Sequence, residues 1–272
     1  PVLITTIVVL GFLVYYLYVL KPKFDPYKKA EALVHDNNIN EAILEYRKIL
    51  DDNPGDSVVH YKISELYFKK NQIDQAVIHL EEIVKINKYS YELDKAAIQQ
   101  KLGKAYLLRH ELEKAFQKYL DILADYPRNV EALYQVAFIA LGQEHFELAQ
   151  KQFERLLAQN KKSFEILFGA GIAFFQNQRT QEAINYFKEA LQLDPHSDIA
   201  NLAMAFAQRE KRDFKTAINY IKMVADNSKD HTAVFIAKRL LGILLIQTRQ
   251  AKKSIKIFED LLQFARDNAM QD

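Results

Sequence analysis

Histidines and closely spaced glycines are the residues of this sequence whose types could carry out chemistry. Seven histidines are spread along the chain, with no HExxH motif and no close pair at metal-ligand spacing: His35, His60, His79, His110, His145, His196 and His231. Gly169 and Gly171 begin a pattern that would suit a nucleotide-binding loop, but Phe174 stands at the place of the third glycine, in a helical pattern. We expect these glycines to serve helix packing, and we predict no metal and no cofactor.

Cysteine is absent, which excludes disulfides, thiol nucleophiles and cysteine-ligated metals. Tyrosine, histidine and glutamate are plentiful, but no triad can be argued from their spacing. We therefore predict that the protein is not an enzyme. The 37 basic and 35 acidic side chains nearly balance, so no nucleic-acid partner is predicted.

The composition favours an all-α protein. Only 7 glycines and 6 prolines occur in 272 residues, which is too little turn chemistry for a many-stranded sheet. Ala, Leu, Glu, Lys and Gln, which are good helix formers, dominate long stretches.

The first twenty residues have the length and apolarity of a membrane span. Residues 1–20 carry no charge, and a helix of that length reaches about 30 Å, the thickness of a bilayer's hydrocarbon core. Tyr15, Tyr16 and Tyr18 gather at one end, where aromatic rings prefer the interface. A cleaved signal peptide would need a basic leader and a small-residue cleavage site, and a core helix would need partners on every side. We predict one transmembrane anchor.

Basic residues predict the orientation of this anchor. Lys21, Lys23, Lys28 and Lys29 follow it, so the positive-inside rule predicts a single-pass protein of the bacterial inner membrane whose following domain is cytoplasmic. The periplasm is the alternative, because the chain begins at Pro1 and upstream lysines would reverse the rule. Residues 21–27, with two prolines, are expected to form a short stiff linker before a helical domain of residues 28–272.

Small residues recur at intervals of 34, which indicates a repeat. The repeated position is occupied by Ala42, Ala76, Ala115, Ala149, Ala183, Ala217 and Ser254. A second small residue lies twelve positions before each of these, and a large apolar residue lies four positions after. We expect the small residues to let two helices approach closely and the large ones to fill the gaps between neighbouring helix pairs. Pro54, Pro127 and Pro195 are expected to end second helices.

The third and fifth copies, LGKAYLLRHELEKAFQKYLDILADYP (102–127) and GAGIAFFQNQRTQEAINYFKEALQLDP (169–195), resemble the tetratricopeptide repeat (TPR). The resemblance implies a right-handed superhelical solenoid of about seven helix-turn-helix repeats. Their expected bounds are 24–55, 57–90, 96–129, 130–163, 164–197, 198–231 and 235–268. Extra residues at 87–95 and 227–232 are interpreted as a longer helix end and a longer loop, respectively.

In TPR proteins the ligand groove is lined by the first helices at recurring positions. Applied to this chain, those positions give Tyr61, Phe68, Tyr134, Phe138, Leu141, Phe168, Ile172, Phe175, Leu202, Phe206, Ile243 and Ile246. The ninth helix position, usually polar in the family, is apolar in four successive repeats. Because continuous apolar strips are rarely left in water, we expect an amphipathic helix of a protein partner to cover it. Tighter coiling, another part of this chain, or a second copy remain alternatives.

A different use of TPR proteins, capture of an acidic C-terminal tail, needs several basic side chains that project together into the groove. Lys104 and Arg239 stand instead among apolar neighbours. At the far end, the last helix adds Ile257, Leu262 and Phe264 as apolar surface. We expect either that the natural chain continues or that this uncapped end docks on a partner, since repeat arrays normally finish with a polar outer face.

A narrower resemblance concerns the elongated third repeat. The apolar leader together with residues 89–115, YSYELDKAAIQQKLGKAYLLRHELEKA, resembles the membrane-anchored lipopolysaccharide-assembly TPR protein of bacteria, without that family's rubredoxin-like module of four cysteines. We predict a membrane-anchored scaffold or adaptor that binds a partner segment in its groove. The alternatives are a structural subunit of a large envelope assembly, such as a ring or collar, and a regulatory adaptor that presents a client enzyme to a membrane protease. A homo- or hetero-oligomer is compatible with each.

Overall fold

The computed structural model describes residues 11–13, 25–89 and 93–268, and these are helical with no β-strand. The predicted anchor therefore lies outside the described residues, apart from residues 11–13. Within the described ranges, no helix is long and apolar enough to span a bilayer. The all-α prediction is confirmed for the part of the chain that the structure describes.

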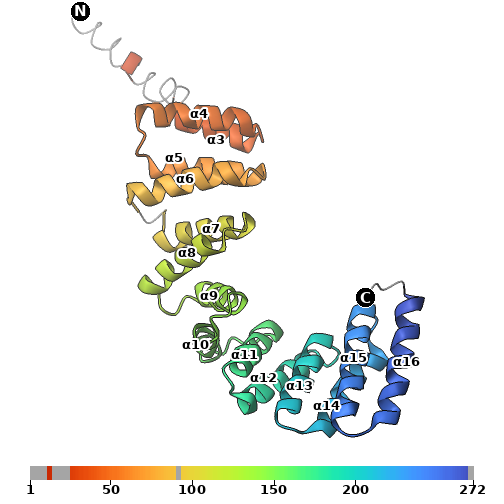
Figure 1. The fold of residues 1–272 in the computed structure, drawn as a ribbon. Helices are drawn as coiled ribbons and strands as arrows, with labels where there is room; N and C mark the ends of the chain where they lie inside the picture. The colour runs from red at the N-terminus through yellow and green to blue at the C-terminus, as the bar shows by residue number, and fades with distance from the viewer. Residues whose placement is uncertain (1–10, 14–24, 90–92, 269–272) are drawn as a thin grey trace, which may run out of the picture. The chain divides into compact units, whose positions relative to one another are not determined.

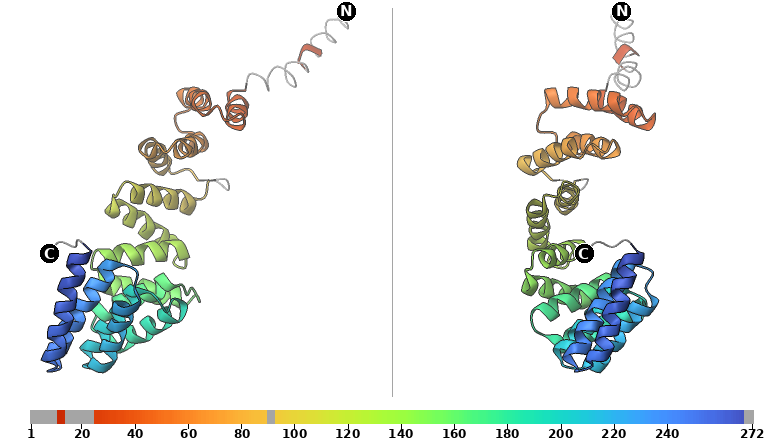
Figure 2. Two further views of the ribbon diagram at one scale, coloured as in Figure 1. Left: turned by 90° about the vertical axis from the view of Figure 1, so that its right-hand side faces the viewer. Right: turned by 45° about the vertical axis from the view of Figure 1, so that its right-hand side comes forward.

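The described helices form seven hairpins, each made of a first helix (helix A) and a second helix (helix B) that pack against each other (Figures 1 and 2). They fall into two compact units, Pro1–Pro127 and Arg128–Asp272. Unit 1 holds the hairpins α3 (Pro26–His35) with α4 (Ile39–Asp52), α5 (Ser57–Lys69) with α6 (Ile73–Ile86), and α7 (Lys95–Leu108) with α8 (Leu112–Asp125). Unit 2 holds α9 (Val130–Gly142) with α10 (Phe146–Leu157), α11 (Phe164–Gln176) with α12 (Thr180–Leu193), α13 (Asp198–Glu210) with α14 (Phe214–Asn227), and α15 (His231–Gln247) with α16 (Ala251–Asp267).

Every described helix A begins at a side-chain cap. The capping oxygen accepts a hydrogen bond from a backbone N–H of the first turn, which satisfies a donor that the helix itself leaves unpaired. The caps are Asp25, Asp56, Asp94, Asn129, Ser163, Ser197 and Asp230. Because Asp25 caps α3, this helix already begins at Pro26, inside the segment predicted to be a linker.

The turn from helix A to helix B is the same in all seven hairpins. Each turn contains one residue with positive φ, five positions before the repeated small residue: Asn37, Asn71, His110, Glu144, Gln178, Arg212 and Arg249. This left-handed residue ends one helix and reverses the chain within a few residues. Helix B follows at once, mostly without a side-chain cap.

The two departures from the 34-residue period are accommodated in the opposite way from the prediction. At residues 87–89 and 93–94 the extra length is not helical, because Asn87 has a left-handed conformation (φ 53°) that ends α6 at Ile86, and α7 begins only at Lys95. At residues 227–232 the extra length lengthens a helix instead. Asp230 caps α15, which has 17 residues where α13 has 13.

The core consists of the recurring small and large residues. In unit 2, Ala149, Ala183 and Ala217 are fully buried, and so are the rings of Phe153 and Phe187. Burying a side chain of this size stabilises the fold by about 1.5–3 kcal/mol. The same repeat positions are buried in unit 1, where Ala42, Ala76 and Ala115 accompany Tyr46, Leu80 and Tyr119.

Candidate ligand-binding surface

The twelve predicted groove residues lie on helices A and remain partly accessible. Tyr61 and Phe68 lie on α5 of unit 1, and the other ten lie on α9, α11, α13 and α15 of unit 2. Ten of the twelve are half-buried, whereas Ile243 and Ile246 are exposed by 39% and 58%. We call the ten residues of unit 2 the A-helix surface.

Neighbouring helices A of unit 2 lie side by side, so this surface is continuous. Helix α9 contacts α11, and α11 contacts α13. A pocket between α13 and α15 is lined by residues of both helices. The apolar residues of all four helices therefore form one surface rather than four separate patches.

The aromatic rings of this surface are held from beneath by fully buried rings of helices B. Phe138 meets Phe153 edge-on with ring centres 5.2 Å apart, and Phe168 lies 5.8 Å from Phe187. At the surface, the Tyr134 ring lies 4.5 Å from that of Phe138. Such pairs contribute about 0.5–1.5 kcal/mol beyond their buried area. The rings are thus positioned before any ligand arrives, which lowers the entropic cost of binding.

Glycines in α11 make this support possible, as the sequence predicted. A Cβ atom on Gly169 would lie 2.5 Å from Cζ of Phe153, and one on Gly171 would collide with the Phe187 ring. The ring of Phe153, on α10, also contacts Phe138 of α9. It therefore fills the space between one hairpin and the next, which is the role expected for the large residues.

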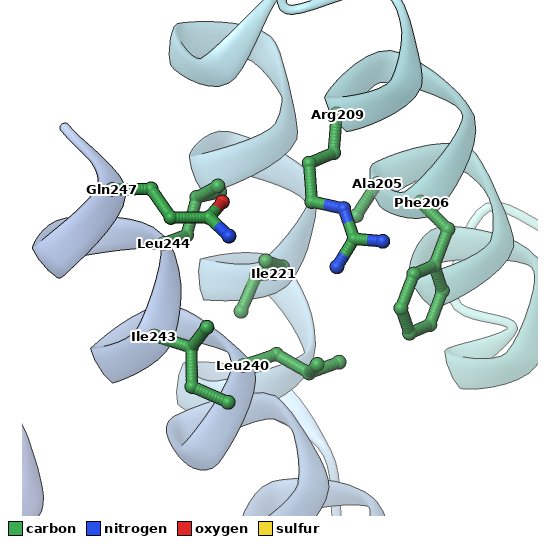
Figure 3. Close-up of a pocket in the computed structure, with 8 residues that line it drawn as sticks. All are labelled: Ala205, Phe206, Arg209, Ile221, Leu240, Ile243, Leu244 and Gln247. Carbon is green, nitrogen blue, oxygen red and sulfur yellow. The ribbon is translucent and has the colours of Figure 1, made fainter.

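The pocket between α13 and α15 holds about 40 Å³ (Figure 3). Its walls are mostly apolar, and two of the predicted groove residues, Phe206 and Ile243, belong to them. The lining residues are Ala205, Phe206, Arg209, Ile221, Leu240, Ile243, Leu244 and Gln247. The Arg209 guanidinium points toward the space between Phe206 and Leu240, and its central carbon lies 5.4 Å from the centre of the Phe206 ring.

Two histidines of unit 1 that are far apart in the sequence lie together in the structure. Nδ1 of His60 on α5 and Nδ1 of His79 on α6 are 2.9 Å apart, and His60 Nε2 lies 3.0 Å from the Pro54 carbonyl oxygen. Burial, then the charges of His60 and Arg47, lower the pKa of His79 to about 4. In the described ranges, no group of three metal-ligating side chains occurs.

A signal for this pair was present in the sequence. In an antiparallel hairpin, the residue numbers of two residues that face each other add up to nearly the same value along the whole hairpin. In the second repeat, the facing residues Ser64 and Ala76 give this value. His60 and His79 fit it within one position. Spacing along the chain, the criterion applied to the histidines, conceals such pairs.

Comparison with known proteins agrees with this architecture. Profiles of the family described as "Tetratricopeptide repeat" match residues 33–90, 139–198 and 174–239, which together cover more than half of the chain. The chain belongs to the tetratricopeptide-repeat family. No significant match was found among curated proteins. The matches do not confirm the narrower resemblance to the lipopolysaccharide-assembly TPR protein.

Solved TPR structures share the fold. The C-terminal part of a TPR repeat-containing protein from Cytophaga hutchinsonii matches with a TM-score of 0.65 and 19% identity, over 88% of this chain and 95% of that chain. YrrB, described as a TPR protein with an unusual peptide-binding site, matches with 0.61 and 18%, over 71% and 97%. MamA from Desulfovibrio magneticus RS-1 matches with 0.53 and 19%, over 61% and 91%.

Three TPR repeats of this chain have polar residues at the position where the family usually has tryptophan. His60, Gln99 and Asn201 occupy it, and all three are buried. Asn201 Nδ2 donates to the carbonyl oxygens of Pro195 and Ser197, at 3.2 and 2.9 Å. Asn201, like His60 with its contact to the Pro54 carbonyl oxygen, ties the start of helix A to the preceding loop, a role that the apolar Leu133 and Leu167 do not have.

Helix α16 exposes an apolar face, whereas the equivalent face of α14 is covered by neighbouring helices. Ile218 and Ala225 of α14 pack into the core between α13 and α15. The equivalent residues of α16, Ile255 and Leu262, are each 58% exposed. Phe264, by contrast, is half-buried, with its ring 4.9 Å from Lys238 Nζ of α15.

Proposed function

We propose that this TPR protein is a membrane-anchored adaptor that binds a segment of another protein on the A-helix surface of unit 2. The observation that carries the proposal is the continuity of this surface, together with the buried rings that hold Phe138 and Phe168 in place. TPR proteins mediate protein–protein interactions, and the similar fold of YrrB, whose description names a peptide-binding site, supports the proposal.

An amphipathic helix is the ligand that suits this surface best. Its apolar side chains recur at i, i+3, i+4 and i+7 and form one stripe, and its backbone hydrogen bonds are already satisfied. Laid on the A-helix surface, the stripe removes apolar area from water on both partners. Each well-buried apolar side chain then contributes about 1.5–3 kcal/mol before the entropic costs of association are subtracted.

The anchor part of the proposal rests on sequence. The uncharged residues 1–20, the tyrosines at the end of this segment and the lysines after it support a single-pass protein of the bacterial inner membrane with cytoplasmic repeats. Protease accessibility of the repeats in sealed spheroplasts tests the orientation: cleavage from outside would place them in the periplasm.

A groove variant tests binding. We expect the combined substitution of Phe138, Ile172 and Phe206 by Asn to reduce partner capture, measured by crosslinking and pull-down from native membranes, by at least about tenfold, because it removes the apolar centre of the surface. A matched control replaces Ile78, Leu193 and Met223, exposed residues of helices B, by Asn. Helicity by circular dichroism should stay unchanged in both. Equal capture by the groove variant and the wild type would refute the proposal.

A structural role in an envelope assembly is the second candidate, because α16 leaves Ile255 and Leu262 exposed where α14 is covered. A neighbouring subunit on this face would supply the missing cover. The chain should then form oligomers in sedimentation analysis, and Ile255→Lys should dissociate them. A monomer at high concentration would count against this role.

The regulatory variant of the adaptor, which presents a client enzyme to a membrane protease, rests on the resemblance of residues 89–115 to the lipopolysaccharide-assembly TPR protein. Its distinguishing consequence is a change in the lifetime of the client. If the captured partner has the same half-life in cells with and without the chain, the simple adaptor is the better description.

A further inference from the structure

The pocket between α13 and α15 combines an apolar floor with polar groups at its edge. Ile221, Leu240 and Leu244 form the floor, and they come from α14 and α15. Arg209 from α13 and Gln247 from α15 stand at the edge (Figure 3). A pocket of about 40 Å³ suits the end of one apolar side chain, not a whole aromatic ligand.

Among the residues that the structure describes, the cation at this edge has only a weak acidic contact. Arg209 Nη2 lies 3.4 Å from Oε1 of Glu210, the next residue along the same helix, and the carboxylate of Glu210 is itself 54% exposed. An exposed pair of this kind contributes little, so the Arg209 guanidinium can exchange this contact for another carboxylate at small cost. The guanidinium already stacks near the Phe206 ring, which restricts its position.

A second positive charge lies on the face of α15 that carries Ile243. Arg239 is exposed and precedes Ile243 by four residues, which is one helical turn. Acidic residues lie in the first turns of the helices A of the fourth to sixth repeats, Glu131 on α9, Glu165 on α11 and Asp198 on α13.

We infer that this pocket takes an apolar side chain of the partner segment and that Arg209 binds a carboxylate placed beside that side chain. The inference rests on the proposed function and names the chemistry of its ligand. The carboxylate accepts from the guanidinium, which presents several N–H donors in a fixed plane. A basic residue at the same place in the ligand would face Arg209 directly and be rejected, so the site selects acidic over basic amphipathic segments.

This chemistry differs from the capture of a free chain terminus. A terminal carboxylate clamp needs several cations that converge on one point, whereas Arg209 stands alone at the edge of an apolar pocket, among the residues that line it. The ligand is therefore an internal segment, anchored by burial and selected by charge.

A random-peptide display library is the probe. We would select it on the full chain held in lipid nanodiscs, and on its Arg209→Glu and Lys222→Glu variants. Lys222 is exposed on α14, outside the pocket, so its reversal is the matched control. We expect the wild type and the Lys222→Glu variant to enrich peptides with Asp or Glu within one turn of an apolar residue. The Arg209→Glu variant should lose this preference or favour Lys and Arg instead.

Affinity measurements on one enriched synthetic peptide complete the test. Replacing its carboxylate by the amide should weaken binding to the wild type by about tenfold, the size expected for one charge-assisted contact, and should leave binding to the Arg209→Glu variant unweakened. Enriched peptides without an acidic preference, or with the same preference in the Arg209→Glu variant, overturn the inference but leave peptide binding intact. No enrichment on any variant overturns the proposed function as well. A change of oligomeric state caused by Arg209→Glu would make a second copy the occupant and also overturn the inference.

Discussion

Mild acid is expected to weaken the second repeat through the His60–His79 pair. Because the Pro54 carbonyl can only accept, His60 Nε2 carries a proton, so in the neutral ring Nδ1 is an acceptor. His79 then donates from its Nδ1 to His60 across the 2.9 Å contact. One added proton places a charge in this partly buried cluster, and a second would set two N–H groups against each other.

The sign of the effect follows from the direction of the pKa shift. Burial is the largest cause that lowers the His79 pKa from 6.5 to about 4, and the charges of His60 and Arg47 lower it further, while Glu82 opposes them. The Tyr67 ring, which stacks at 5.7 Å, adds no positive charge. The unfolded chain therefore binds the proton first. Stability is fully present above about pH 6.5 and is lost as the pH falls toward about 4.

The magnitude is bounded by the same shift. A pKa change from 6.5 to about 4 corresponds to a loss of folding stability of at most about 3 kcal/mol, reached when the pH is below both pKa values. At about pH 5 the loss is about 2 kcal/mol. The half-buried ring is partly screened by water, which reduces the expected loss at about pH 5 to roughly 1 kcal/mol.

Chemical denaturation at about pH 7.5 and about pH 5 measures this loss. Between these two pH values, the free energy of unfolding of the wild type should fall by roughly 1 kcal/mol more than that of a His79→Gln variant, which cannot titrate at this position. His145→Gln, a change at an exposed histidine, should behave like the wild type. An NMR titration of His79 with a midpoint near its ordinary 6.5, or an equal loss in His79→Gln, would refute the reasoning.

Two further predictions concern packing and backbone conformation, and both are measured as changes in the free energy of unfolding. Gly171→Ala should destabilise the protein by about 1–3 kcal/mol, because the new Cβ collides with the fully buried Phe187 ring. Gly142→Ala, whose new Cβ has no atom near it, should leave the stability unchanged. Equal effects of the two substitutions would contradict the packing role of Gly171. Glu144→Gly should stabilise the protein by up to about 1 kcal/mol, because Glu144 has φ 61° and glycine adopts this conformation without strain. A loss of stability would show that the contacts of the Glu144 side chain matter more than its backbone conformation.

Most of the fold could be predicted because a repeat protein is specified locally. Within each unit a hairpin contacts mainly its neighbours, and the interval between Ala115, Ala149 and Ala183 already locates the buried positions. The two departures from the period were located correctly, but the longer helix and the longer loop were assigned to them in the wrong order, since length alone does not say whether extra residues extend a helix or a loop. That choice depended on the left-handed Asn87 and on the cap at Asp230.

The candidate surface was only partly predictable for a similar reason. Family positions on helix A identified residues such as Phe138 and Phe206, because the face of a helix follows from its period. The same positions could not show that buried Phe153 supports Phe138 from below, or that Arg209 turns toward a pocket shared with α15. These contacts join separate helices.

The sequence by itself determined the repeat, its helical hairpins and the residues that fill them, because each of these depends on patterns within about 34 residues. Only the tertiary structure decided that His60 meets His79 and that Arg209 and Ile243 border one pocket. The physical reason is that such contacts depend on how far and at what angle neighbouring helices pack. Those quantities are set by the fitted volumes of buried side chains, not by the spacing of residues along the chain.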